Sequence, residues 1–112
     1  MLTEKSFDTG DVVLSYDEGS SAGPPMILLH GLTDIRQTWQ ENLIPALGES
    51  WHLYVCDLRG HGKSGRAASE KGYRLADYGH DFATFLRARV NEPAVVVGHS
   101  RRCRPHRSKR LR

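Results

Sequence analysis

Three short apolar runs, each followed by a polar turn that contains glycine, constrain the fold of this sequence more than any other feature. The runs are Met26–Leu29, Trp51–Cys56 and Val95–Val97. Continuous apolar runs of this length are typical of strands that are buried on both faces, as in a parallel sheet. Such a sheet brings the carboxyl ends of its strands to one edge, where ligands bind. We therefore expect the three turns to meet at that edge.

The segments between the runs are long enough for crossover helices. Apolar residues recur at helical spacing over 36–47 and again over 75–90, where Leu75 begins the apolar stripe. Residues 6–18 predict a hairpin, with turn residues at 8–11. The predicted fold class is α/β, with a mostly parallel sheet, flanking helices and an N-terminal antiparallel hairpin.

Residues 101–112 differ from the rest of the chain in charge. They hold seven of the 16 Lys and Arg residues and none of the 13 Asp and Glu residues. We therefore predict one domain over residues 1–100 and a basic, disordered tail over 101–112. The tail could bind polyanions non-specifically, but it has no interleaved aromatic residues and no recognisable module, so specific binding of nucleic acid is not expected.

The remaining composition excludes several classes of protein. The two cysteines, Cys56 and Cys103, suggest neither a disulfide framework nor a metal site. No apolar signal segment or membrane-spanning run is present, so we expect a cytoplasmic protein with no membrane partner. Nothing in the sequence indicates the oligomeric state.

The turn after the third run carries a candidate nucleophile. Gly98-His99-Ser100 forms the first half of G-x-S-x-G, the turn that exposes a serine hydroxyl at the end of a strand, but Arg102 replaces the second glycine. A serine hydroxyl needs a histidine base oriented by a carboxylate before it becomes a useful nucleophile. The alternative interpretation is an ordinary serine in a strand-to-helix turn.

All three turns together resemble those of the α/β-hydrolase family, over nearly all of residues 7–100. His30-Gly31 is similar to the family's oxyanion loop, and Gly98-His99-Ser100 to its nucleophile turn. The turn after the second run is similar to a further family motif, with matching residues Asp57, Arg59, Gly60, Gly62 and Ser64. The resemblance implies that this chain forms part of an α/β-hydrolase fold.

The resemblance also implies a role for each matching residue. Ser100 would be the nucleophile, and the backbone N–H groups of Leu32 and Arg101 would form the oxyanion hole. His30 and His99 would shape their loops, while Asp57 and Arg59 would hold their turn together. The substrate would be a small molecule with a carboxylic ester, thioester or amide bond, since family members that hydrolyse epoxides carry Asp at the nucleophile position. No metal or organic cofactor is implied.

The family's acid and histidine follow the nucleophile far downstream. The residues after Ser100 contain no acid, so His106 is rejected as the base. We hypothesise a frameshift or truncation near codon 101, which retranslation of the coding DNA in the other two frames would test. The expected product is an inactive fragment of a hydrolase; the alternative is a non-catalytic fragment whose basic tail binds polyanions.

One further motif supports a different class of function. Gly60–Gly65 satisfies G-x-G-x-x-G and is followed about twenty residues later by Asp81, as in dinucleotide-binding proteins. Residues 66–72 predict a polar loop instead of the helix that this motif requires, so we favour this interpretation less. A P-loop would need glycine at the position of Asp57 and is rejected.

Overall fold

The computed structural model describes residues 2–19, 22–30, 36, 39, 43–47, 50–98 and 110–111. The strands are β1 (Leu2–Asp8), β2 (Val13–Gly19), β3 (Pro25–Leu29), β4 (His52–Cys56), β5 (Val95–Gly98) and β6 (Arg110–Leu111). The helices are α2 (Ile44–Leu47), the 3-10 turn η1 (Glu70–Tyr73), α3 (Leu75–Phe85) and the π-helical turn η2 (Leu86–Val90).

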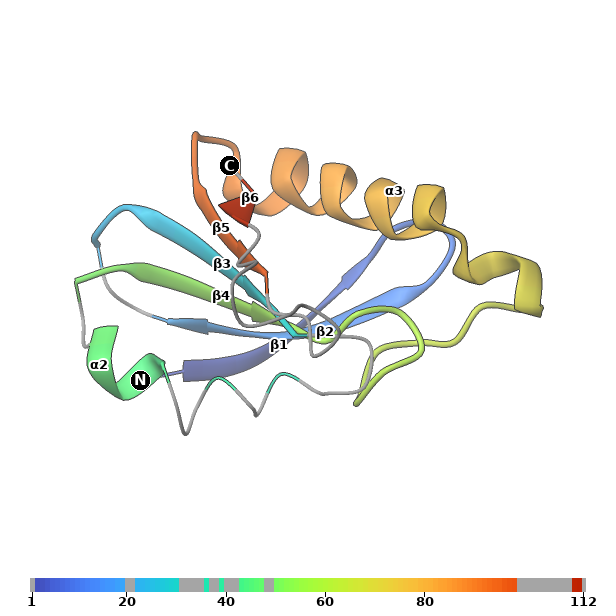
Figure 1. Cartoon of the computed structure of the whole chain (residues 1–112), viewed down its shortest axis with the longest axis horizontal. Coiled ribbons are helices and arrows are strands. Elements are labelled where there is room, and N and C mark those ends of the chain that lie inside the picture. The colour runs from blue at the N-terminus through green and yellow to red at the C-terminus, as the bar shows by residue number, and fades with distance from the viewer. Residues whose placement is uncertain are drawn as a thin grey trace.

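The strands form one mixed sheet in the order β1-β2-β4-β3-β5-β6 (Figure 1). Only β4, β3 and β5 are parallel to one another. The prediction of a mostly parallel sheet is wrong in this respect, because the hairpin pairs antiparallel with β4 through β2, and β6 pairs antiparallel with β5. The α/β layering and the N-terminal hairpin are confirmed.

Helices lie on both faces of the sheet, with α3 on one side and α2 on the other (Figure 1). Alternate residues of β3 therefore enter two separate apolar clusters. Ile27 and Leu29 pack in the cluster that contains Phe85 of α3. Met26 and Leu28 pack on the other face, in the cluster that contains Trp39. This division explains why the whole of β3 is apolar.

The second predicted helix is observed with nearly the expected bounds. α3 continues into η2, which ends at Val90 before Asn91 adopts a left-handed conformation. Leu75, the first residue of α3, was expected on the buried stripe but is 88% exposed. A 3-10 turn over Glu70–Tyr73 interrupts the predicted polar loop.

The first predicted helix, over 36–47, is described only at residues 36, 39 and 43–47. Within the described part, α2 covers Ile44–Leu47, and the Leu43 N–H donates to the Trp39 carbonyl as in a helical turn. No helix in the described part of the chain has both the length and the apolar character needed to cross a membrane.

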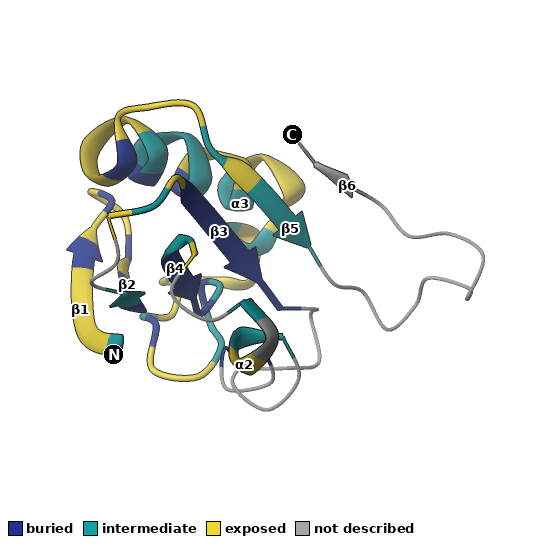
Figure 2. Cartoon of the chain, turned by 90° about the vertical axis from the view of Figure 1, so that its left-hand side faces the viewer, coloured by how far each residue is buried: buried dark blue, intermediate teal, exposed yellow. Residues whose placement is uncertain are grey.

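Strand β5 is less buried than its sequence predicts. Figure 2 shows β3 as buried, whereas β5 is intermediate or exposed, and Val95 is 41% exposed. The valine run was expected to be covered on both faces, but β5 lies next to the short edge strand β6. Apart from Arg110–Leu111, residues 101–112 lie outside the described residues, so the disordered tail stays a prediction.

Candidate functional site

The C-terminal ends of the three parallel strands, β4, β3 and β5, lie side by side at one edge of the sheet. Leu29, the last residue of β3, is the register partner of Cys56 on β4 and of Gly98 on β5. The segments that begin at His30, Asp57 and His99 therefore leave the sheet from neighbouring positions. Five predicted site residues lie outside the described residues: Gly31, Leu32, His99, Ser100 and Arg101.

His30 connects the C-terminal end of β3 to the turn that follows β4. Its ring is buried, and its Nε2 lies 3.0 Å from the backbone nitrogen of Leu58. Because the Leu58 N–H is a donor, Nε2 must accept and carries no proton, which assigns the proton of the neutral ring to Nδ1. This hydrogen bond links the residue after β3 to the turn after β4. Its ring also lies beside that of His61, with 5.1 Å between centroids.

The carboxylate of Asp57 organises the start of the turn after β4. Oδ1 accepts the Arg36 N–H at 2.7 Å, and Oδ2 accepts the Lys63 N–H at 3.1 Å. A side chain at Gly62 would overlap this carboxylate, and Gly62 has a positive φ of 50°. The turn therefore needs glycine at this position both for its conformation and for the space that Asp57 occupies.

Arg36 is a buried cation that the sequence did not single out. It is 1% exposed, and its NH1 donates to Asp57 Oδ2 at 3.1 Å and to Ser15 Oγ at 2.6 Å. Its Nε donates to Asp17 at 3.2 Å, and its NH2 lies 3.4 Å from Glu4. In sequence it begins a predicted amphipathic helix, where an arginine is ordinarily a solvated residue, so no pattern marked it.

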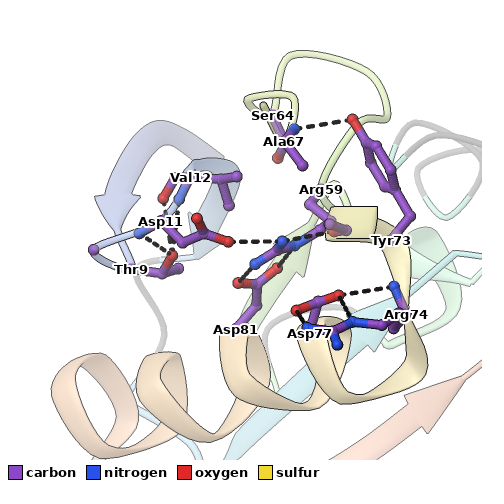
Figure 3. A network of polar contacts seen from close by, with 12 residues as sticks. Thr9, Asp11, Val12, Arg59, Ser64, Ala67, Tyr73, Arg74, Asp77 and Asp81 are labelled. Carbon is purple, nitrogen blue, oxygen red and sulfur yellow. Dashed lines mark hydrogen bonds and ion pairs between the residues drawn. The ribbon is translucent and has the colours of Figure 1, made fainter. Parts of the chain in front are cut away.

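Arg59 connects the turn after β4 to α3 (Figure 3). Its guanidinium forms a bidentate ion pair with Asp81, at 2.7 and 2.6 Å. NH1 also donates to Asp11 and to the Gly72 carbonyl, at 2.8 and 2.7 Å. The hydrogen bonds that Arg59 donates to Asp81 contribute most to raising the pKa of Arg59, so this side chain stays charged.

Ser64 links the turn after β4 to β2 of the hairpin by hydrogen bonds. Its hydroxyl accepts the Ser15 N–H at 2.8 Å and donates to the Asp57 carbonyl at 2.7 Å. The Gly65 N–H donates to Val13 in β2. Gly60 has a φ of 76°, and a side chain there would meet the ring of Tyr73. These contacts are all internal to the fold.

The geometry argues against dinucleotide binding by Gly60–Gly65. A phosphate cradle requires backbone N–H groups aimed at an empty concavity. Here the Gly60 N–H donates to the Gly65 carbonyl, and the Lys63 N–H donates to the Asp57 carboxylate. The Asp57 carboxylate thus accepts a hydrogen bond that a phosphate would otherwise need. Asp81, the candidate ribose ligand, is held by Arg59. The required groups are thus committed to other contacts.

A small apolar hollow, partly open to solvent, lies between α3 and the sheet. Cys56 is among its lining residues, together with Leu29, Phe82 and Phe85. Burial raises the pKa of the Cys56 thiol, which keeps it protonated and makes it a poor nucleophile. Among the described residues, no group of three His, Cys, Asp or Glu side chains could hold a metal ion.

A family model described as alpha/beta hydrolase fold matches residues 24–101. A 2-(acetamidomethylene)succinate hydrolase from Mesorhizobium japonicum is 36% identical over 83% of this chain and 32% of its own length. Epoxide hydrolase A from Mycobacterium tuberculosis is 33% identical, over 87% and 30% respectively. The chain thus spans about a third of the length of these curated relatives.

The three-dimensional comparison agrees with these matches. The crystal structure of epoxide hydrolase A from Mycobacterium thermoresistibile superposes with a TM-score of 0.78 at 27% identity. The match covers 89% of this chain and 32% of that one. The predicted resemblance, drawn from three turns, is confirmed.

Proposed function

Because the chain belongs to the α/β-hydrolase fold family, we propose that it carries the nucleophile of an enzyme that hydrolyses an ester-like bond. One observation supports this most: Leu29 and Gly98 are register partners on adjacent parallel strands. His30-Gly31 and His99-Ser100 follow directly, so the proposed oxyanion loop and the proposed nucleophile leave the sheet from neighbouring positions. Acyl transfer needs these two elements within reach of one carbonyl group.

The proposed reaction proceeds in two halves. The Ser100 oxygen adds to the acyl carbon as its proton passes to a base, and the carbonyl oxygen becomes an oxyanion that the Leu32 and Arg101 N–H groups stabilise. The tetrahedral species collapses, and the alcohol, thiol or amine leaves with a proton. Water then adds to the acyl-serine in the same way and releases the acid.

Serine at position 100 favours an acyl substrate over an epoxide. Several relatives are named epoxide hydrolases, but the 36% identical relative is named for hydrolysis of 2-(acetamidomethylene)succinate. Epoxide opening in this family uses a carboxylate nucleophile, which a serine at the same position does not supply. We therefore propose a carboxylic ester, thioester or amide as the substrate class.

Three ionisable groups near the C-terminal ends of the parallel strands are engaged in other contacts. His30 Nε2 accepts from Leu58, Asp57 is held by Arg36, and Asp81 by Arg59. The acid and base of the proposed mechanism are therefore assigned to none of these residues, and we expect residues 1–112 alone to turn over esters little or not at all. The second candidate function is polyanion binding, which the seven basic residues of the tail favour.

One pair of assays separates the two functions. Turnover of p-nitrophenyl acetate by the chain is compared with that of Ser100→Ala; turnover that depends on Ser100 supports the acyl-enzyme mechanism and contradicts inactivity of residues 1–112 alone. Binding to heparin is compared with and without residues 101–112 at low and high salt. Salt-sensitive binding that is lost on deletion supports the polyanion function, and unchanged binding contradicts it.

The frameshift hypothesis is tested on the coding DNA. If it is correct, translation after codon 101 in another frame yields glycine near position 102, an apolar helix, and later an Asp and a His. The ester assay on that longer product, with Ser100→Ala as control, then tests the nucleophile directly. A longer product that hydrolyses esters equally well without the Ser100 hydroxyl would contradict the proposed mechanism.

A further inference from the structure

We infer that His30 is an acid-sensitive link between the C-terminal end of β3 and the turn that follows β4. While the ring is neutral, its Nε2 accepts the Leu58 N–H. Once the ring is protonated, Nε2 releases Leu58 and donates to Asp57 Oδ1 instead. All three residues belong to the described part of the chain, and the inference does not depend on the proposed reaction.

The contact with Leu58 requires a neutral ring. Nε2 lies 3.0 Å from the Leu58 nitrogen, and the side chain of His30 is fully buried. If the ring were protonated, both nitrogens would carry a hydrogen, and two donors would face each other at hydrogen-bond distance. Protonation of His30 and its hydrogen bond to Leu58 therefore exclude one another.

The protonated ring has an acceptor close by. Asp57 Oδ1 lies 3.9 Å from the same Nε2, and its side chain is also fully buried. A hydrogen bond needs at most about 3.2 Å, so a shift of the ring by about 1 Å would form one. Oδ1 already accepts the Arg36 N–H at 2.7 Å, and its second lone pair can accept another donor. Such a bond between charged groups is stronger than the neutral one that it replaces.

Charged and titratable groups face the ring from residue 36 and from the turn after β4. Asp57 favours the protonated form, and Arg36 offsets part of this effect because its NH1 lies 3.1 Å from Asp57 Oδ2. The ring of His61 lies 5.1 Å away between centroids, and a proton on His61 would oppose one on His30. Histidine ordinarily changes its charge between about pH 5 and 8, so we expect the change of partner in this range.

The test follows the full 112-residue chain, labelled with 15N, by NMR from pH 7.5 to pH 5. The nitrogen shifts of the imidazole show which ring atoms of His30 carry protons. The scalar coupling between the Leu58 nitrogen and His30 Nε2 shows directly whether the hydrogen bond between them is present. A general change in the stability of the turn does not produce this coupling. The amides of Ile27 and Val55, in the buried strands, report whether the chain stays folded.

We expect an unprotonated Nε2 and a measurable coupling at pH 7.5. Protonation of His30 and loss of the coupling should then share one midpoint above pH 5, through which the Ile27 and Val55 shifts stay native. A protonated Nε2 at pH 7.5, a coupling that survives protonation, or a ring still neutral at pH 5 would overturn the proposal. Loss of the coupling only when Ile27 and Val55 report unfolding would overturn it as well.

His30→Gln separates this link from other titrations nearby. The glutamine carbonyl can accept the Leu58 N–H but does not titrate, so the Leu58 amide shift should lose its pH dependence between pH 7.5 and pH 5. His61→Gln is the matched control, which removes the neighbouring ring and should keep that dependence. Equal titration of Leu58 in His30→Gln and in the parent chain would contradict the proposal.

Asp57→Asn tests the second partner. It removes the charge that receives the protonated ring, so the midpoint of His30 should fall by about one pH unit. An unchanged midpoint would overturn the change of partner to Asp57. If circular dichroism shows that either substituted chain does not fold, the coupling measured in the unaltered chain decides the proposal alone.

Discussion

Arg59 and Asp81 form a buried bidentate ion pair, with Nε to Oδ2 at 2.7 Å and NH2 to Oδ1 at 2.6 Å (Figure 3). Arg59 belongs to the turn after β4, and Asp81 lies in the middle of α3. The same guanidinium binds Asp11 in the hairpin turn and the carbonyl of Gly72 in η1. One side chain thus holds together segments that are remote in sequence.

Removal of the carboxylate in Asp81→Ala should lower the free energy of unfolding by roughly 3–5 kcal/mol, because it leaves a buried arginine without its main partner. Urea unfolding followed by circular dichroism measures the change. Glu70→Ala, at an exposed carboxylate in η1, is the control and should have almost no effect. A loss for Asp81→Ala no larger than that of the control would show that the pair contributes little.

Gly62→Ala should be more destabilising than the same change at Gly10. Both glycines have a positive φ, of 50° and 94°, so both substitutions carry the cost of a left-handed conformation, about 1–2 kcal/mol. Only at Gly62 would the new methyl group overlap the Asp57 carboxylate, since nothing lies within 4 Å at Gly10. The difference in urea midpoints isolates the clash, and equal losses would contradict the role given to Asp57.

Acid should weaken the contact between β2 and β4. Burial raises the pKa of Glu18, but hydrogen bonds from His52 and Lys5 outweigh it and leave the pKa below its usual 4.5. A carboxyl whose pKa is lowered by folding stabilises the protein above its unfolded pKa, and this stabilisation is lost as the pH falls through the folded value. The contribution should be about 1 kcal/mol or less, given the partial exposure of the pair.

Unfolding free energies at pH 7, 5, 4 and 3 measure this dependence. Glu18→Gln should flatten the profile below pH 4.5, whereas Glu70→Gln should leave it unchanged. A Glu18→Gln profile that parallels the parent at every pH would refute the assignment.

Gly79→Ala should stabilise the chain. Gly79 is exposed in the interior of α3, and a methyl group there would meet nothing within 4 Å. Alanine is favoured over glycine in a helix by about 1 kcal/mol because it loses less backbone entropy on folding. Thermal unfolding should show a higher midpoint. A lower midpoint would indicate that another surface approaches α3 at this residue.

The sequence predicts the parallel strands and the second helix well because their apolar periodicity is strong. It predicts the sheet's pairing less well, since a local pattern does not show which distant strand a hairpin meets. Asp17 illustrates the limit: the predicted hairpin contains it, but the local pattern does not show that it pairs with Val55 of β4 or accepts a hydrogen bond from Arg36. Val95 shows the converse, because an apolar run does not reveal that its strand lies near the edge of the sheet.

The candidate site is predictable only in part, for a similar reason. Asp57, Arg59 and Ser64 belong to a compact motif, so the resemblance to the family identified them. Their partners Arg36 and Asp81 are brought to them by folding, from 21 and 22 positions away in sequence. Ser100, Leu32 and Arg101 lie outside the described residues, so their predicted roles stay predictions.

Strand β3 supplies alternate side chains to the apolar clusters on both faces of the sheet. Its Ile27 and Leu28, each fully buried, point to opposite sides of the same five-residue strand. Neither layer can separate from the sheet without exposing the strand that supports the other. Unfolding of the apolar cluster on one face should therefore unfold the cluster on the other, so that the chain unfolds as a single cooperative unit.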